Sequence, residues 1–133
     1  MTDLIEVKTA DLTGEALGWA VGKAEGLELE LAGPSGYITF YRVLRRRGGK
    51  ASWVFERYNP WESWALGGPL IDKHRVWLEP PVASFKYEAL IYGADGALAA
   101  YSGQCDSSLI AACRAIVAAK LGDTVQVPKV LLP

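Results

Sequence analysis

The only histidine of this 133-residue chain, His74, stands two residues after Asp72. On a strand the two side chains would point to the same side of the sheet, and Asp72 could orient the imidazole as a general base. Ser63 is the conceivable nucleophile of such a site, but no Gly-x-Ser-x-Gly turn surrounds it. We therefore rank catalysis last among the functions considered and predict a non-enzymatic protein with no catalytic residues.

The chain offers few ligands for a metal or a cofactor. A helix through the eight residues from Cys105 to Cys113 would separate them by about 12 Å, whereas a disulfide needs Cα atoms within about 7 Å. We expect two free thiols in a reducing cytoplasm. One histidine and two unpaired cysteines do not build a usual zinc site. No Gly-Lys-Ser/Thr follows Gly67-Gly68-Pro69 to make a phosphate loop, and we predict neither a metal nor a cofactor.

Large aromatic side chains gather in residues 58–74, together with two prolines and a Gly-Gly pair. Prolines and glycines interrupt regular structure, so we predict an irregular loop rather than one helix or strand. Tryptophan and tyrosine suit a partner-binding patch, although tryptophans are usually well buried and these could instead belong to the core. We expect Trp61 to be exposed and Trp64 to be buried. The candidate binding residues of the loop are Tyr58, Trp61, Trp64, Asp72 and His74.

Charge is unevenly distributed along the chain, although the net charge is only −1 and gives no general attraction to nucleic acid or membrane. Residues 1–31 hold seven acidic side chains against two lysines, whereas residues 42–57 hold six basic side chains against one glutamate. The basic side chains could straddle phosphates, or they could form a solvated turn that blocks edge-to-edge aggregation. The candidate phosphate-binding residues are Arg42, Arg45, Arg46, Arg47 and Lys50.

The length suits one domain, residues 1–133, which would bury roughly two-thirds of its unfolded surface. Half of the residues are hydrophobic, which excludes general disorder. No apolar run approaches the ~20 residues of a membrane span, and the first residues lack the pattern of a signal peptide. We therefore expect a cytoplasmic protein that does not contact a membrane.

Hydrophobic periodicity and capping residues predict two helices, at Thr13–Glu25 and Ser108–Leu121. The second is apolar all round, which indicates burial on more than one side. If its alanine-rich side is left uncovered by the sheet, we expect a homodimer there. Alternating patterns and turn residues predict strands at 27–31, 37–44, 51–58, 76–78, 85–92, 97–101 and 125–127, and a turn at Gly33–Gly36. Together these elements indicate an α+β fold, an antiparallel sheet of about five or six strands with two helices packed on one face.

Three blocks of the sequence resemble one known family. The first block is Val7–Gly14 leading into Ala16–Gly26. The second is Tyr58-Asn59-Pro60 followed by Trp64-Ala65-x-Gly67-Gly68-Pro69-Leu70-Ile71. The third is Leu109–Arg114 with Val117–Asp123 and Val125–Pro128. In this order they resemble the NinX-like proteins of tailed phages and prophages, a family of unknown function. Residues 32–57 depart from the pattern and look like an inserted basic β-hairpin.

The resemblance implies a phage or prophage accessory protein acting in an infected bacterial host, without naming an activity. We predict that it binds a host or phage protein through residues 58–74. A first alternative is a small-ligand or nucleotide-binding protein, in which aromatic rings stack on a base and arginines hold phosphate. A second alternative is nucleic-acid binding through the basic hairpin.

Overall fold

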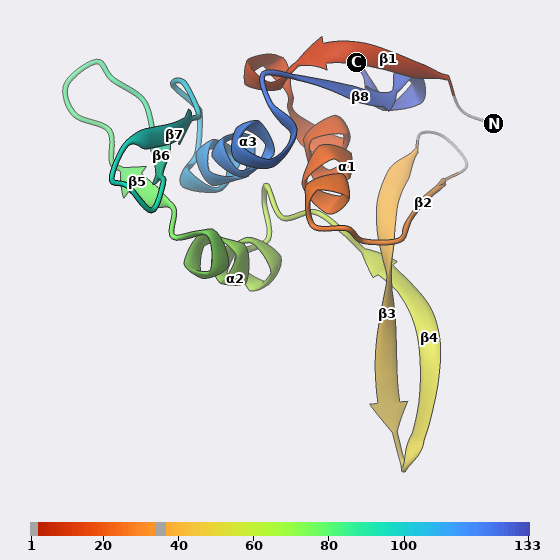
Figure 1. Ribbon diagram of the computed structural model, residues 1–133. Helices are drawn as coiled ribbons and strands as arrows, with labels where there is room; N and C mark the ends of the chain where they lie inside the picture. Colours follow the sequence, from red (N-terminus) through yellow and green to blue (C-terminus); the bar gives the residue numbers. More distant parts are fainter. Residues whose placement is uncertain (1–2, 34–36) are drawn as a thin grey trace.

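The computed structural model describes residues 3–33 and 37–133, and Figure 1 shows their arrangement. In this part of the chain three α-helices, two short 3-10 helices and eight strands form an α+β fold. The strands make three separate antiparallel sheets of two, three and three strands. The α+β class is therefore confirmed, whereas the prediction of one larger sheet with two helices is wrong.

The smallest sheet joins the two ends of the chain. β1 (Leu4–Lys8) runs antiparallel to β8 (Thr124–Pro128). The 3-10 helices Thr9–Asp11 and Lys129–Leu131 follow these strands directly. Sequence patterns did not predict β1, because its partner is at the other end of the chain and only one of its side chains is even partly buried.

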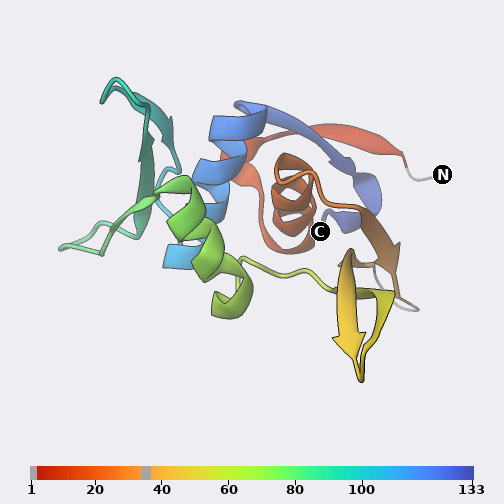
Figure 2. The ribbon, with the colours of Figure 1, turned by 60° about the horizontal axis from the view of Figure 1, so that its bottom comes forward.

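The second sheet consists of β2 (Leu29–Ala32), β3 (Ile38–Arg47) and β4 (Lys50–Arg57). β3 and β4 form a long hairpin that projects from the body of the molecule (Figure 1 and Figure 2). Gly48 and Gly49 join them with φ angles of 57° and 78°, the left-handed conformations that a two-residue turn of this type needs. The predicted hairpin is therefore confirmed. The turn predicted at Gly33–Gly36 falls largely on residues 34–36, outside the described part of the chain.

α3 (Ser108–Leu121) lies at the centre of the fold, between α1 and the third sheet (Figure 1). Its bounds match the prediction, because its end signals are local: the Ser107 hydroxyl accepts a hydrogen bond from the Ile110 amide at 3.1 Å, and Gly122 follows the last turn. On one side, the helix shares a buried cluster with the apolar side chains of α1 (Gly14–Ala24), which include Leu17 and Val21.

The third sheet covers the other side of α3. It consists of β5 (Trp77–Glu79), β6 (Glu88–Tyr92) and β7 (Leu98–Tyr101). The alanine-rich side of α3 packs against β6 and β7. The helix is therefore buried on two sides, as predicted, but the sheet covers the side for which a second subunit was expected. The uncovered helix side on which the homodimer prediction rested is therefore not present.

α2 (Trp64–His74) occupies most of the segment that was predicted to be an irregular loop, and this prediction is wrong. Pro69 has no N–H group to donate to the Ala65 carbonyl one turn earlier. The helix tolerates this proline because Ala65 is exposed to water. Leu66 and Leu70, one turn apart, pack against the buried core. Tertiary packing thus overrides the local breaking signals. In the described residues no helix is long and apolar enough to cross a bilayer.

Candidate functional site

The beginnings of α2 and α3 border a groove of about 520 Å³. Its lining combines aromatic and aliphatic side chains with two carboxylates. The lining residues are Trp61, Glu62, Trp64, Tyr87, Asp106, Ser107, Ser108, Leu109 and Ile110. Two of the predicted binding residues, Trp61 and Trp64, therefore lie on one concave surface.

Gly67 fixes the position of α2 on α3. A Cβ added at Gly67 would lie 2.6 Å from Cδ2 of Leu109 and 2.7 Å from the Pro60 carbonyl oxygen, so only glycine permits this approach. Leu109 is buried beneath the contact. The close packing holds the first turn of α2, and with it Trp64, at the edge of the groove.

The two tryptophans have the reverse of the exposures that the sequence predicts. Trp64 is the first residue of α2 and is 58% exposed. Trp61 is partly buried, because its ring packs against Gly18 of α1, where a Cβ would clash with it, and because the Arg57 guanidinium lies 5.4 Å above it. The prediction failed because it treated the segment as a loop, whereas the start of a helix directs Trp64 outward.

Tyr58 belongs to the core rather than to a binding surface. Its ring lies 4.9 Å from that of Tyr41, and only 3% of the residue is exposed. Burial raises the pKa of the Tyr58 hydroxyl well above its usual value. Because the side chain does not line the groove, its role is to anchor the start of this segment to the hairpin.

Asp72 and His74 do not form the predicted pair. They lie two residues apart on a helix, where such side chains do not face each other. His74 Nε2 instead lies 2.7 Å from Glu25 Oε2, and Lys73 Nζ donates to Glu25 Oε1 at 2.8 Å. Burial acts to raise the pKa of Glu25, but the hydrogen bonds and charges of Lys73 and His74 together hold that pKa below its usual value. This cluster joins the ends of α1 and α2.

The predicted basic residues separate into paired and unpaired groups. Arg45 forms an ion pair with Glu56, with Nε donating to Oε2 at 2.7 Å. Arg42 contacts Glu28 at 3.1 Å, and its guanidinium lies 4.2 Å above the Trp53 ring. Among the five predicted phosphate-binding residues, the three that make no ion pair with a described residue are Arg46, Arg47 and Lys50.

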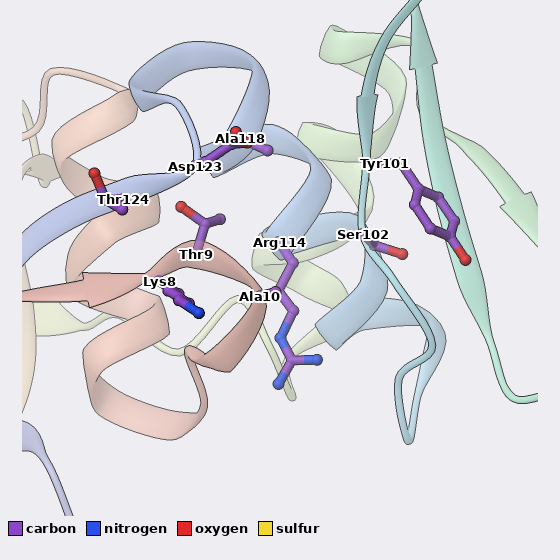
Figure 3. A pocket seen from close by; sticks show the side chains of 9 residues that line it. All are labelled: Lys8, Thr9, Ala10, Tyr101, Ser102, Arg114, Ala118, Asp123 and Thr124. Atoms are coloured by element: carbon purple, nitrogen blue, oxygen red, sulfur yellow. The ribbon is translucent and has the colours of Figure 1, made fainter.

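A smaller cavity of about 260 Å³ lies between the 3-10 helix Thr9–Asp11, β7 and α3 (Figure 3). Its polar groups mainly hold the chain together, because Arg114 Nε donates to the Leu12 carbonyl at 2.8 Å and Thr9 Oγ1 donates to the Gly122 carbonyl at 2.7 Å. The Tyr101 ring points away from Arg114 (Figure 3), and its hydroxyl donates to Glu88 at 2.5 Å. We therefore interpret this cavity as structural.

Both cysteines are free, as predicted, and the structure buries both of them. Burial raises the pKa of the Cys113 thiol to about 12, which makes it an unreactive part of the core. Within residues 3–33 and 37–133, no group of three or more histidine, cysteine, aspartate or glutamate side chains could hold a metal ion.

The fold and groove define a small α+β protein with a candidate binding surface, and comparison with known proteins places it in a family. A family model described as "Bacteriophage P22, NinX" matches residues 8–120, which is most of the chain. The protein therefore belongs to the NinX family of phage proteins, as the three sequence blocks indicate. A search of curated proteins gave no match.

Proposed function

We propose that this phage accessory protein is non-enzymatic and acts in the infected host by holding a segment of a host or phage protein in the groove beside Trp64. The observation that carries the proposal is the 58% exposure of Trp64, the first residue of α2, at the edge of a concave surface. Exposed tryptophans beside a well-packed depression are typical anchors of protein interfaces.

The charges of the groove specify the kind of partner. Its ionisable lining residues are Glu62, Asp106 and Tyr87, so it has no lining cation. The two carboxylates are exposed and make surface contacts: Glu62 accepts a hydrogen bond from Asn59 at 2.8 Å and lies 4.0 Å from the Arg57 guanidinium, and Asp106 accepts from Lys86 at 2.9 Å. A peptide segment that presents an apolar side chain beside a lysine or arginine would complement this surface. The same carboxylates would repel the phosphate of a nucleotide, which disfavours the small-ligand alternative.

The proposal is tested with tagged full-length protein in lysate from infected cells, followed by titration of the captured protein. Trp64→Ala should weaken binding of the identified partner by about 30-fold or more, because a hot-spot aromatic contributes at least about 2 kcal/mol. The matched control is Trp77→Ala, since Trp77 is equally exposed, at 61%, but lies on β5 outside the groove.

The melting temperature should be unchanged in both variants. Glu62→Lys should weaken binding as well, because it places a like charge against the basic partner. A partner that binds Trp64→Ala and the wild type equally would contradict the assignment of the groove.

A further inference from the structure

We propose that the β3–β4 hairpin is a second binding site, which takes single-stranded nucleic acid on one face. The bases would stack on Trp53 and Phe55, and the arginines and lysine near the tip would contact the phosphates. This site is separate from the Trp64 groove, and its ligand differs from the protein segment proposed there.

The strand register places the aromatic rings and two arginines on the same face. Arg42 pairs with Phe55, Leu44 with Trp53, and Arg46 with Ala51, and directly opposed residues share a face of an antiparallel pair. Trp53 is 58% exposed and Phe55 is 42% exposed. This face, the aromatic strip, therefore carries two exposed aromatic rings on β4 and two arginines on β3, with the Arg42 guanidinium 4.2 Å above one side of the Trp53 ring.

The opposite face has a different character. Arg45 on that face is neutralised by Glu56, and Val43 pairs with Val54. By the same register Arg47 and Lys50, which lie opposite each other at the end of the hairpin, also belong to this face. Arg42 at the other end of the strip is paired with Glu28, so the positive charge without an ion pair is concentrated at the tip, in Arg46, Arg47 and Lys50. There a phosphate backbone could run past the end of the aromatic strip.

The spacing of the rings favours an unpaired strand. Trp53 and Phe55 are two residues apart on β4, a separation of about 7 Å. Bases in a duplex are only about 3.4 Å apart along each strand, so both rings cannot meet consecutive stacked bases. An extended single strand exposes the faces of its bases and can match the longer interval. Duplex DNA would use the basic residues but leave both rings without a partner.

Acidic residues of the N-terminal part contact only the base of the hairpin, where Glu28 pairs with Arg42 and Glu15 with Arg57. The hairpin projects from the body (Figure 1), and residues 42–57 carry six basic side chains against one glutamate. Residues 1–31, in contrast, contain seven acidic side chains and two lysines. The net charge of −1 is therefore the sum of an acidic N-terminal part and a basic hairpin. Because the ion pairs involve Arg42, Arg45 and Arg57, the tip is the part of the hairpin that would attract a polyanion.

The test is fluorescence anisotropy of full-length protein with labelled fifteen-nucleotide oligo(dT) and oligo(U), with a labelled duplex and with anionic phosphatidylserine vesicles as further arms. We expect binding of a single strand at low salt and weaker binding of the duplex. Comparing the affinities for oligo(dT) and oligo(U) shows whether the protein prefers single-stranded DNA or single-stranded RNA. Absence of binding to both strands, equal binding of the duplex, or binding to vesicles alone would overturn the proposal.

Substitutions locate the contact. Trp53→Ala should weaken strand binding by about 5- to 150-fold, the effect of losing one stacked base, whereas Trp53→Phe should retain most of the affinity because it keeps a ring. Trp77→Ala is the control for loss of an exposed tryptophan and should bind as the wild type does. Trp64→Ala should also bind the strand normally, which separates this site from the groove. Unchanged affinity in Trp53→Ala would overturn the stacking role.

Salt dependence identifies the arginines that neutralise phosphates. The double variant Arg46→Ala/Arg47→Ala should reduce the slope of log affinity against log salt by about 1.4, because each phosphate that is no longer neutralised lowers the slope by about 0.7. The control Arg45→Ala/Glu56→Ala removes the neutral ion pair of the opposite face and should leave the slope unchanged. Equal slopes in the wild type and the Arg46→Ala/Arg47→Ala variant would exclude these arginines from the binding site.

Discussion

α3 and the β3–β4 hairpin have opposite surroundings. α3 packs against α1 on one side and against the third sheet on the other, and its apolar side chains make two buried clusters. The outer part of the hairpin is surrounded by solvent, although it contains Trp53, Phe55 and Leu44. Apolar residues of α3 are explained by folding. The apolar side chains of the outer hairpin are not buried by folding, and our proposal is that they serve binding.

The largest effect is expected at the centre of the buried region. Leu109→Asp should unfold the protein, because an unpaired carboxylate beneath the α2–α3 contact costs several kcal/mol out of the roughly 5–15 that stabilise a domain. Circular dichroism and thermal melting measure the result. A soluble Leu109→Asp protein that melts cooperatively near the wild-type temperature would contradict the assignment of α3 as the core.

The next largest effect on stability is expected for one of the two tryptophans that line the groove, and the other should have almost none. Trp61→Ala should destabilise the fold by about 3 kcal/mol, since the ring packs on Gly18 and the core. Trp64→Ala should change stability by less than about 0.5 kcal/mol, because the side chain is exposed. Urea denaturation of both variants gives the two free energies of unfolding. The reverse order would contradict the assignment of Trp61 to the core and of Trp64 to the surface.

Adjacent glycines provide a matched test of the α2–α3 contact. Gly67→Ala should destabilise the protein by up to about 3 kcal/mol, because its Cβ would overlap the Pro60 carbonyl oxygen, which cannot move without moving the backbone. Gly68→Ala meets no atom within 4 Å and should stabilise the helix by up to about 1 kcal/mol. Equal unfolding free energies for the two variants would contradict the close approach of these helices.

The Glu25 cluster has a smaller effect that depends on pH. Because the pKa of Glu25 is lower in the folded protein than its ordinary 4.5, its contribution is present above that value and is lost as pH falls through the folded pKa. Glu25→Gln should therefore cost about 1–2 kcal/mol near neutral pH, and its difference from wild type should shrink in acid. Glu79→Gln, at an exposed position, is the control. A difference that is constant with pH would exclude this linkage.

Local signals account for what the sequence predicted. The bounds of α3 follow from Ser107 and Gly122, and the hairpin follows from Gly48-Gly49 between two β-rich segments. β1 was missed because its partner strand is distant in sequence. α2 was missed because Pro69 and its glycines are local breakers, and the contact that stabilises it is with α3.

The candidate site was predicted only in part for the same reason. Residue types identified Trp61 and Trp64, but their exposures depend on the helix that was missed. The aromatic strip of the hairpin depends on strand register, which neither composition nor charge specifies.

The smallest effect on stability is expected in the hairpin. Trp53→Ala should change the unfolding free energy by less than about 0.5 kcal/mol, because the ring contacts mainly Arg42 on the surface. Chemical denaturation gives this value. A loss comparable with that of Trp61→Ala would mean that the strip is part of the folded core after all.

The division between a folded body and a binding hairpin is tested most directly by shortening the hairpin. Val43 and Val54 lie opposite each other in the register. Pairs in an antiparallel ladder alternate between hydrogen-bonded and non-hydrogen-bonded types. The Val43–Val54 pair is an even number of steps from the Arg47–Lys50 pair that closes the present turn, so the two pairs are of the same type. A variant in which Asn-Gly replaces residues 44–53 therefore retains a suitable two-residue turn.

Melting curves of this variant and the wild type, each with and without oligo(dT), provide the decisive measurement. We expect the same melting temperature for both proteins without the strand. With the strand, only the wild type should melt at a higher temperature, because a ligand stabilises the state that binds it. A much lower melting temperature for the shortened protein, or an equal shift in both, would contradict the account.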